Sequence, residues 1–139
     1  MENKIAVVEK KFEYKEHECI CIFNRLGFRC GYVSVKENKE FSTYDIACHC
    51  GLTYNGELPL EYEPKHKYYI GFDCGHICDK QNYKQAYAYG LISETELFYY
   101  KTFHVDTGGV ERTLDYVENQ CKKIVDQLEY KEQDNESNI

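Results

Sequence analysis

The run Cys19-Ile20-Cys21-Ile22-Phe23 decides the fold class of this chain, because it is continuously apolar and is bounded by polar residues. Such a short run is typical of a strand that is buried on both faces of a sheet. A second apolar run, Phe28 to Val35, follows after the turn at residues 24–27, and so short a connection predicts an antiparallel hairpin. Cys48 to Tyr54 and Tyr68 to Cys74 predict two further strands.

The C-terminal part of the chain carries the clearest helical pattern. Apolar residues recur at three- and four-residue steps and define one stripe, formed by Leu114, Val117, Cys121, Ile124, Val125 and Leu128. Thr113 is a suitable N-cap, and Asp115 in the first turn favours the positive end of the helix dipole. From Tyr130 onward the sequence is polar, so we expect one domain over residues 1–130 and a frayed tail over 131–139.

The remaining segments complete an α+β domain. Residues 4–16 carry apolar side chains at helical spacing and predict a short N-terminal helix, and residues 55–56 (Asn-Gly) predict a turn. Residues 83–89 predict a short helix and residues 97–105 a strand. We therefore expect a mostly antiparallel sheet of about four to five strands, with the long C-terminal helix packed on one face.

Composition excludes several classes of protein. The chain has 139 residues, a formal net charge of −7, 14 tyrosines and eight cysteines, and its length fits one domain. The acidic excess argues against nonspecific nucleic-acid binding and against an anionic membrane surface, because both require a basic footprint. No stretch resembles a signal-peptide core or approaches the roughly 20 apolar residues of a membrane span. We expect a cytoplasmic protein with reduced cysteines.

Two of the predicted strands carry polar residues on one face. Because side chains alternate along a strand, His49 projects from one face of the segment 48–54, and Asp73 from one face of the segment 68–74. If the strands are neighbours with these faces together, the two side chains approach each other. Arg112 precedes the C-terminal helix, whose first amides can bind an anion. The candidate ligand-binding residues are, in chain order, His49, Thr53, Tyr54, Tyr69, Asp73, His76, Asp79 and Arg112.

Three interpretations of this cluster remain open. In the first, nitrogen and oxygen donors hold a divalent metal ion that activates a water; the candidate ligands are His49, Asp73, His76 and Asp79. A thiolate zinc variant would use Cys48, Cys50, Cys74 and Cys78 with His76. In the second, the same region is a metal-free pocket for a small polar ligand, with tyrosines stacking on a ring. In the third, His49 and Asp73 form a buried pair that only orders the sheet.

Four segments of the chain resemble a family of uncharacterised small phage and prophage proteins. The segments are Phe28 to Val35, His49 to Tyr54, Ile70 to Asp79 and Arg112 to Val117; the family pattern reads approximately R-x-GYV-x-V, HGGLTY, GFDCxHxxD and RTLEYV. The match extends over most of residues 28–128. It implies a phage origin and a role at the phage–host interface, without a known reaction.

The chain departs from this family pattern at two places. Cys50 replaces a glycine, which weakens a thiolate zinc site that uses it, and Tyr68 and Tyr69 replace tryptophans. The four candidate metal ligands all match the pattern.

The combined prediction is a phage-derived protein of the bacterial cytoplasm that binds a small, nucleotide-type molecule and sequesters a host-defence signal. One alternative is a metal-dependent hydrolase that uses His49, Asp73, His76 and Asp79. The other is a protein–protein inhibitor of a host factor, acting through its acidic, tyrosine-rich surface. The expected partner is a small polar molecule or a host protein, and the sequence does not indicate the catalytic residues or the oligomeric state.

Overall fold

The computed structural model describes residues 4–38, 41–43 and 45–137. Its strands are β1 (Ala6–Tyr14), β2 (His17–Asn24), β3 (Arg29–Val35), β4 (Tyr54–Gly56) and β5 (Tyr68–Asp73). They form one antiparallel sheet in the order β1-β2-β3-β5-β4. The helices are α1 (Tyr83–Ala88), α2 (Glu94–Phe103) and α3 (Leu114–Ser137), and a short 3-10 helix, η1, spans Leu60–Tyr62.

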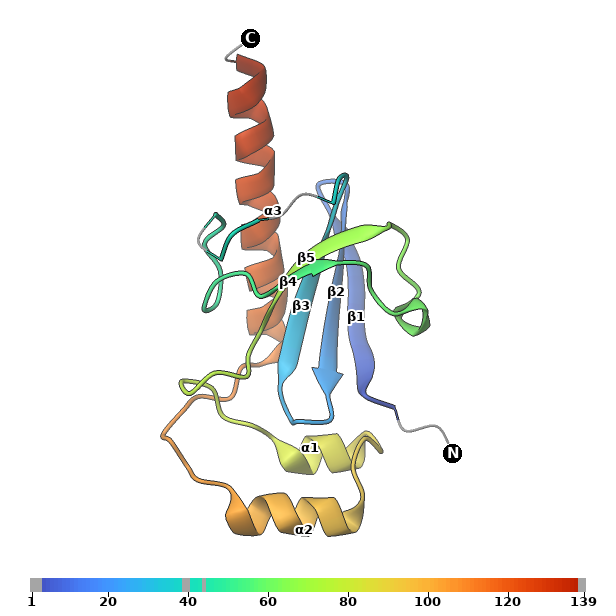
Figure 1. Cartoon of the computed structure of the whole chain (residues 1–139), viewed down its shortest axis with the longest axis vertical. Coiled ribbons are helices and arrows are strands. Elements are labelled where there is room, and N and C mark those ends of the chain that lie inside the picture. The colour runs from blue at the N-terminus through green and yellow to red at the C-terminus, as the bar shows by residue number, and fades with distance from the viewer. Residues whose placement is uncertain (1–3, 39–40, 44, 138–139) are drawn as a thin grey trace.

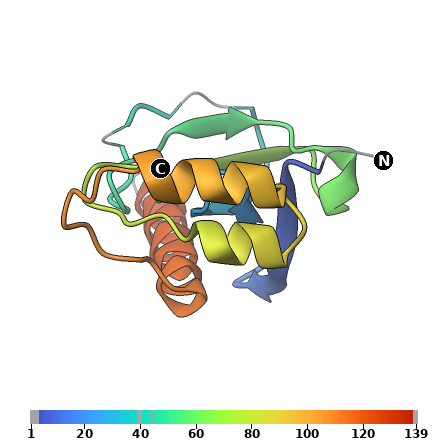
Figure 2. The same ribbon diagram turned by 90° about the horizontal axis from the view of Figure 1, so that it is seen from below.

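The long helix α3 packs across one face of the sheet, which confirms the predicted α+β class (Figure 1). Helices α1 and α2 lie side by side beneath the lower end of the sheet (Figure 2). Helix α3 continues to Ser137, past the boundary expected at residue 130. Within the described ranges, no helix combines the length and apolar character needed to cross a bilayer.

Strand β2 is buried on both faces, as its apolar run predicts. Cys19 and Cys21 face α3 and pack in a cluster with Val33, Ile70, Phe72, Val117, Cys121, Ile124 and Val125. Ile20 and Ile22 face the opposite side, where the connection between β4 and β5 covers them. Burying one such aliphatic side chain contributes roughly 1.5–3 kcal/mol, so this central strand anchors both layers of the core.

A glycine allows α3 to approach the sheet closely. A Cβ atom on Gly31 of β3 would lie 2.6 Å from the ring of Phe72 and 2.8 Å from the Sγ atom of Cys121 on α3. Both distances are shorter than van der Waals contact. The absence of a side chain at this position therefore sets the spacing between helix and sheet.

The prediction of an N-terminal helix over residues 4–16 is wrong, because this segment forms strand β1. It pairs with β2 along its whole length, from Ala6 opposite Asn24 to Tyr14 opposite His17. A bulge between Val8 and Lys10 shifts the register, so the alternation of side chains breaks there. The interrupted alternation explains why the spacing of apolar residues mimics a helix.

The prediction of a strand over residues 97–105 is also wrong, because residues 94–103 form helix α2. Ser93 and Glu96 form a reciprocal capping box: the Ser93 hydroxyl accepts from the Glu96 amide, and the Glu96 carboxylate accepts from the Ser93 amide. The predicted helix at residues 83–89 is confirmed in α1.

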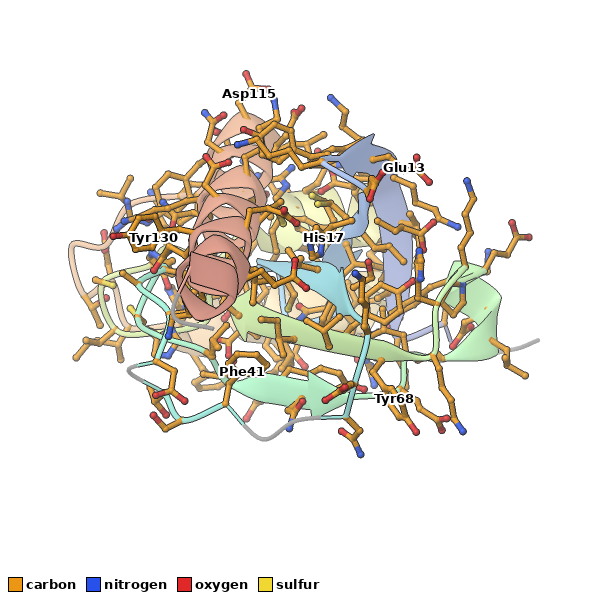
Figure 3. All side chains as sticks on the ribbon, turned by 90° about the horizontal axis from the view of Figure 1, so that it is seen from above. Glu13, His17, Phe41, Tyr68, Asp115 and Tyr130 are labelled. Carbon is orange, nitrogen blue, oxygen red and sulfur yellow. The ribbon has the colours of Figure 1, made fainter. Side chains whose placement is uncertain are left out.

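Histidine 17 joins the sheet to α3. Its Nδ1 atom lies 2.7 Å from the carbonyl oxygen of Ser34, and its Nε2 atom lies 2.8 Å from a carboxylate oxygen of Glu129. Viewed from above, the side chain sits between the strands and the helix (Figure 3). Only 14% of its side chain is exposed.

Candidate functional site

The candidate site lies where three loops meet the first turn of α3. The loops are residues 45–53 before β4, residues 74–82 after β5 and residues 104–113 before α3. The predicted strand at 48–54 is wrong for residues 48–53, which form a turn at 49–51 with irregular segments on either side; Cys50 and Gly51 both have positive φ angles there. The expected turn at residues 55–56 is wrong as well, since both belong to β4. Pairing with β5 holds only from Tyr54, opposite Gly71, to Gly56.

A buried carboxylate, Asp79, is the centre of this site. Its Oδ2 atom accepts hydrogen bonds from His49 Nε2 at 2.9 Å and from the His76 amide at 3.0 Å. Its Oδ1 atom accepts from Arg112 Nε at 2.9 Å and lies 3.7 Å from the Cys78 thiol. Burial raises the pKa of Asp79, but the hydrogen bonds from His49, Arg112 and the His76 amide outweigh it, so the pKa is lowered overall.

Histidine 49 is fixed on both ring nitrogens. While Nε2 faces Asp79, Nδ1 lies 2.6 Å from the Tyr116 hydroxyl on α3. A carboxylate only accepts, so Nε2 donates to Asp79, and the Tyr116 hydroxyl is the partner of Nδ1. The His49 amide also donates to Gln120 of α3 at 2.9 Å. This Asp79–His49–Tyr116 chain ties the turn at residues 48–51 to the helix.

Arginine 112 is held at the N-terminus of α3. Its Nε atom donates to Asp79, its guanidinium carbon lies 5.0 Å from the centre of the Tyr116 ring, and its carbonyl oxygen accepts from Arg29. Thr113 caps the helix, as predicted, by accepting from the Tyr116 amide at 3.2 Å. The bond to Asp79 uses Nε, and 23% of the Arg112 side chain is exposed, so the guanidinium also reaches solvent.

A half-exposed pair, Asp73 and His76, borders the buried network. Asp73 accepts from the Thr53 hydroxyl and from the Gly75 amide, both at 3.0 Å. His76 Nδ1 lies 3.5 Å from Asp73 and 3.7 Å from Asp79, and it has no hydrogen-bond partner among the described residues. The expected contact between His49 and Asp73 is replaced by the contact between His49 and Asp79, because the turn directs His49 toward α3.

Two of the predicted site residues lie elsewhere. Tyr69 is buried on the opposite face of the sheet, where its hydroxyl donates to the buried Glu18 at 2.5 Å. The ring of Tyr54 packs edge-on against Tyr32, 5.2 Å away, and its hydroxyl donates to the carbonyl of Glu57. Sequence reasoning missed Tyr116, although its position four residues after Arg112 is the spacing that brings side chains together on a helix.

The geometry bears in different ways on the nitrogen–oxygen metal site and on the thiolate zinc site. Asp79 already accepts from three donors and a thiol, so it has little capacity left for a cation in the predicted His49, Asp73, His76 and Asp79 set. Of the thiols, Cys74 is buried in the core and Cys48 is half-buried against it. Cys50 and Cys78 are exposed, and their Sγ atoms lie 3.8 Å apart.

A shallow groove of about 620 Å³ lies farther along α3. It is lined by Tyr14, Asn119, Lys122, Lys123, Asp126, Gln127, Tyr130 and Lys131. None of the predicted site residues belongs to this lining. The groove is therefore a separate place at which an anionic molecule could contact lysines.

Comparison with known proteins gives no family assignment. No protein-family model, no curated protein and no solved structure matches this chain. The resemblance to phage proteins stays a prediction. Function is therefore inferred from the geometry and chemistry of the site.

Proposed function

We propose that this chain is a phage-derived protein of the bacterial cytoplasm that binds and sequesters a small, phosphate-bearing molecule of the nucleotide type. The observation that carries the proposal is Arg112, which is fixed by the buried Asp79 at the N-terminus of α3. Charged guanidinium groups next to free helix amides form a favourable site for phosphate. The origin of the protein and its action against host defence rest on the sequence resemblance alone.

The electrostatic arrangement favours binding over turnover. Asp79 keeps Arg112 oriented, and the Tyr116 ring lies 5.0 Å from the guanidinium carbon, so the cation is positioned before a ligand arrives. A preorganised group loses less conformational entropy on binding. The acid–base groups of the site, by contrast, are engaged with one another: His49 bonds to Asp79 and Tyr116. That pairing disfavours the hydrolase alternative, in which these groups would act on a metal-bound water.

The test is calorimetric titration with a panel of mono-, di- and cyclic nucleotides. We expect at least one to bind, and Arg112→Gln to weaken it by at least tenfold, because a charge-assisted hydrogen bond contributes about 1.5–3 kcal/mol. Arg25→Gln is the matched control, since Arg25 pairs with Glu96 of α2 and not with a residue of the site. Equal binding by the wild type and Arg112→Gln would refute the proposal.

Two further variants separate the alternatives. Lys123→Gln alters the groove along α3 and leaves Arg112 in place, so a loss of binding only in this variant would move the ligand site to the groove. Conversion of the nucleotide to a product during the titration would favour the hydrolase. Binding of no nucleotide, together with capture of a host protein, would favour the protein–protein inhibitor.

A further inference from the structure

Two exposed cysteines face each other across the site. Cys50 lies in the turn before β4 and Cys78 in the loop after β5, and their Sγ atoms are 3.8 Å apart. Two thiolates bound to one tetrahedral zinc ion, at about 2.3 Å each, are separated by about 3.8 Å. The pair therefore already has the spacing of two ligands of one ion.

Histidine 76 brings a nitrogen donor to the Cys50 side of this pair. Its ring, the Cys50 thiol and His49 place donor atoms within 4.8 Å of one another. Its Nδ1 atom is buried, has no hydrogen-bond partner among the described residues and faces Asp73 at 3.5 Å. In zinc sites, a histidine commonly binds through one nitrogen while the other donates to a carboxylate. Nε2 of His76 is then the ligand atom, and Asp73 orients the ring.

The backbone conformation of Cys50 supports the same site independently of the donor distances. Its φ angle is 53°, in the left-handed region that favours glycine, yet the residue is a cysteine whose side chain points at Cys78. A non-glycine residue in this conformation is disfavoured and often marks a functional site. Coordination of a metal ion by the thiolate would explain why a cysteine occupies a position that favours glycine.

We propose that Cys50, His76 and Cys78 bind a zinc ion, with the fourth coordination position left for water or for an atom of a ligand. This site goes beyond the proposed nucleotide binding and does not depend on it. Binding releases the thiol protons, because a thiolate is the form that coordinates zinc. His49 stays outside the coordination shell, since both of its ring nitrogens are engaged.

The test uses cobalt(II) as a spectroscopic probe on freshly reduced, chelator-treated protein, followed by displacement with zinc. We expect one cobalt ion per chain, with a thiolate-to-metal charge-transfer band that zinc abolishes. Cys50→Gly and Cys78→Ser should each lower the metal affinity at least 100-fold. Cys50→Gly suits the left-handed backbone, so its metal-free thermal stability should equal or exceed that of the wild type and exclude misfolding as the cause.

Cys48→Ser is the matched control, since Cys48 lies two residues away and packs against the core. It should retain full cobalt binding. An absent thiolate band in the wild type, or an equal loss in Cys48→Ser, would overturn the proposal. Reduced protein that binds no cobalt but forms a Cys50–Cys78 disulfide in air would also overturn it, and would show a redox pair instead.

A second and independent feature is the outer face of α2. None of the residues of this helix is buried, and Phe98, Tyr99 and Phe103 are 71%, 58% and 67% exposed. The rings of Tyr99 and Phe103 lie 4.9 Å apart, so these two form one continuous surface. An exposed aromatic surface of this size on a monomer marks an interaction site.

The size and charge of this face fit a second copy of the chain. Aromatic side chains bury roughly 150–250 Å² each, and these three are about two-thirds exposed, so they supply roughly 400 Å² per copy, or roughly 800 Å² for a pair. Val105 and Tyr87 are also exposed, and a specific interface buries roughly 1,200 Å² in total. In an antiparallel α2 pair, Lys101 of one copy lies opposite Glu94 of the other, which is the self-complementary arrangement of a two-fold dimer.

We infer that this chain forms a homodimer through α2. Sedimentation equilibrium across the micromolar range should show a dimer, and Phe98→Glu should raise its dissociation constant at least tenfold. Leu60→Glu, which alters an exposed apolar residue of η1, should have no effect. Lys101→Glu should weaken the dimer, and adding Glu94→Lys should restore it. A monomeric wild type, or equal dissociation by Leu60→Glu, would refute the inference.

Discussion

At the scale of single residues, Asp79 is the side chain on which the candidate site depends most. Its carboxylate is fully buried and accepts from His49 and Arg112. Asp79→Asn removes the negative charge and leaves both donors without a matched partner, so we expect a loss of about 3 kcal/mol in the free energy of unfolding. Urea denaturation measures this loss. Asp126→Asn, at a half-exposed ion pair with Lys15, should cost less than about 1 kcal/mol; equal losses would contradict the assigned role.

Acid should weaken the fold through the same carboxylate. The pKa of Asp79 is lowered in the folded state from its ordinary value of 3.8, so its ionised form stabilises the protein fully above that value. This stabilisation is lost as the pH falls through the folded pKa. The free energy of unfolding measured between pH 6 and pH 3 should therefore fall more steeply for the wild type than for Asp79→Asn. Parallel curves would show that Asp79 does not titrate with unfolding.

Tyr69 tests whether the site extends to the opposite face of the sheet. Its hydroxyl donates to Glu18 on the opposite face of the sheet, and burial, with this bond, raises the pKa of Tyr69. Tyr69→Phe leaves a buried acceptor partly unsatisfied and should cost about 1–3 kcal/mol of stability by urea denaturation. Nucleotide and metal affinities should not change. If Tyr69→Phe lowered nucleotide or metal affinity without lowering stability, Tyr69 would belong to the site.

At the scale of elements, the contact between the loop after β5 and the loop before α3 holds the site together. Val110 and the segment 78–80 exchange backbone hydrogen bonds at 2.9 Å. A Cβ atom on Gly109 would lie 2.8 Å from the backbone of Asp79, whereas a Cβ atom on Gly108 would meet no atom within 4 Å. Gly109→Ala must therefore displace the segment that carries Cys78 and Asp79.

We expect Gly109→Ala to lower both stability and cobalt affinity. Gly108→Ala is the neighbouring control: its φ angle of 76° makes alanine strained, at a cost of about 1 kcal/mol, but the site should keep its metal affinity. Thermal unfolding and cobalt titration of both variants measure the two effects. If Gly109→Ala binds cobalt as tightly as the wild type, the close packing is not needed for the site.

The elements that the sequence predicts correctly are those whose burial is one-sided or complete. The apolar stripe of α3 and the apolar runs of β2, β3 and β5 match faces that stay buried along the whole element. Strand β1 does not, because its side chains are mostly half-buried and a bulge interrupts the alternation. Helix α2 is rich in aromatic residues, which favours a strand assignment, but the capping box at Ser93 and Glu96 is a sequence signal that identifies its start.

The candidate site was only partly predictable for a related reason. The sequence places His49, His76, Asp79 and Arg112 in one region, since they flank β4, β5 and α3. Their actual contacts depend on the turn at Cys50 and Gly51, whose left-handed backbone directs His49 toward α3 rather than Asp73. A cysteine in such a turn is not anticipated from propensity. Neither the role of Tyr116 nor the pairing of Cys50 with Cys78 follows from local sequence.

At the scale of the whole molecule, the site connects parts of the chain that are far apart in sequence. His49 precedes the edge strand, Asp79 follows the adjacent strand, and Arg112 precedes the helix that packs on one face of the sheet. A ligand that contacts Arg112 should therefore stabilise the sheet and α3 together, by about 2.7 kcal/mol at a concentration 100-fold above its dissociation constant. Helix α2 lies beneath the sheet (Figure 1), and its exposed aromatic residues form the surface that we propose binds a second copy.

Native mass spectrometry with a mixture of nucleotides tests the central claim most directly. The claim is that Arg112, held by Asp79, binds a small phosphate-bearing molecule. We predict one nucleotide adduct per chain for the wild type and for Arg25→Gln, and no adduct for Arg112→Gln under the same conditions. An unliganded wild type, or an adduct that persists in Arg112→Gln, would contradict the claim.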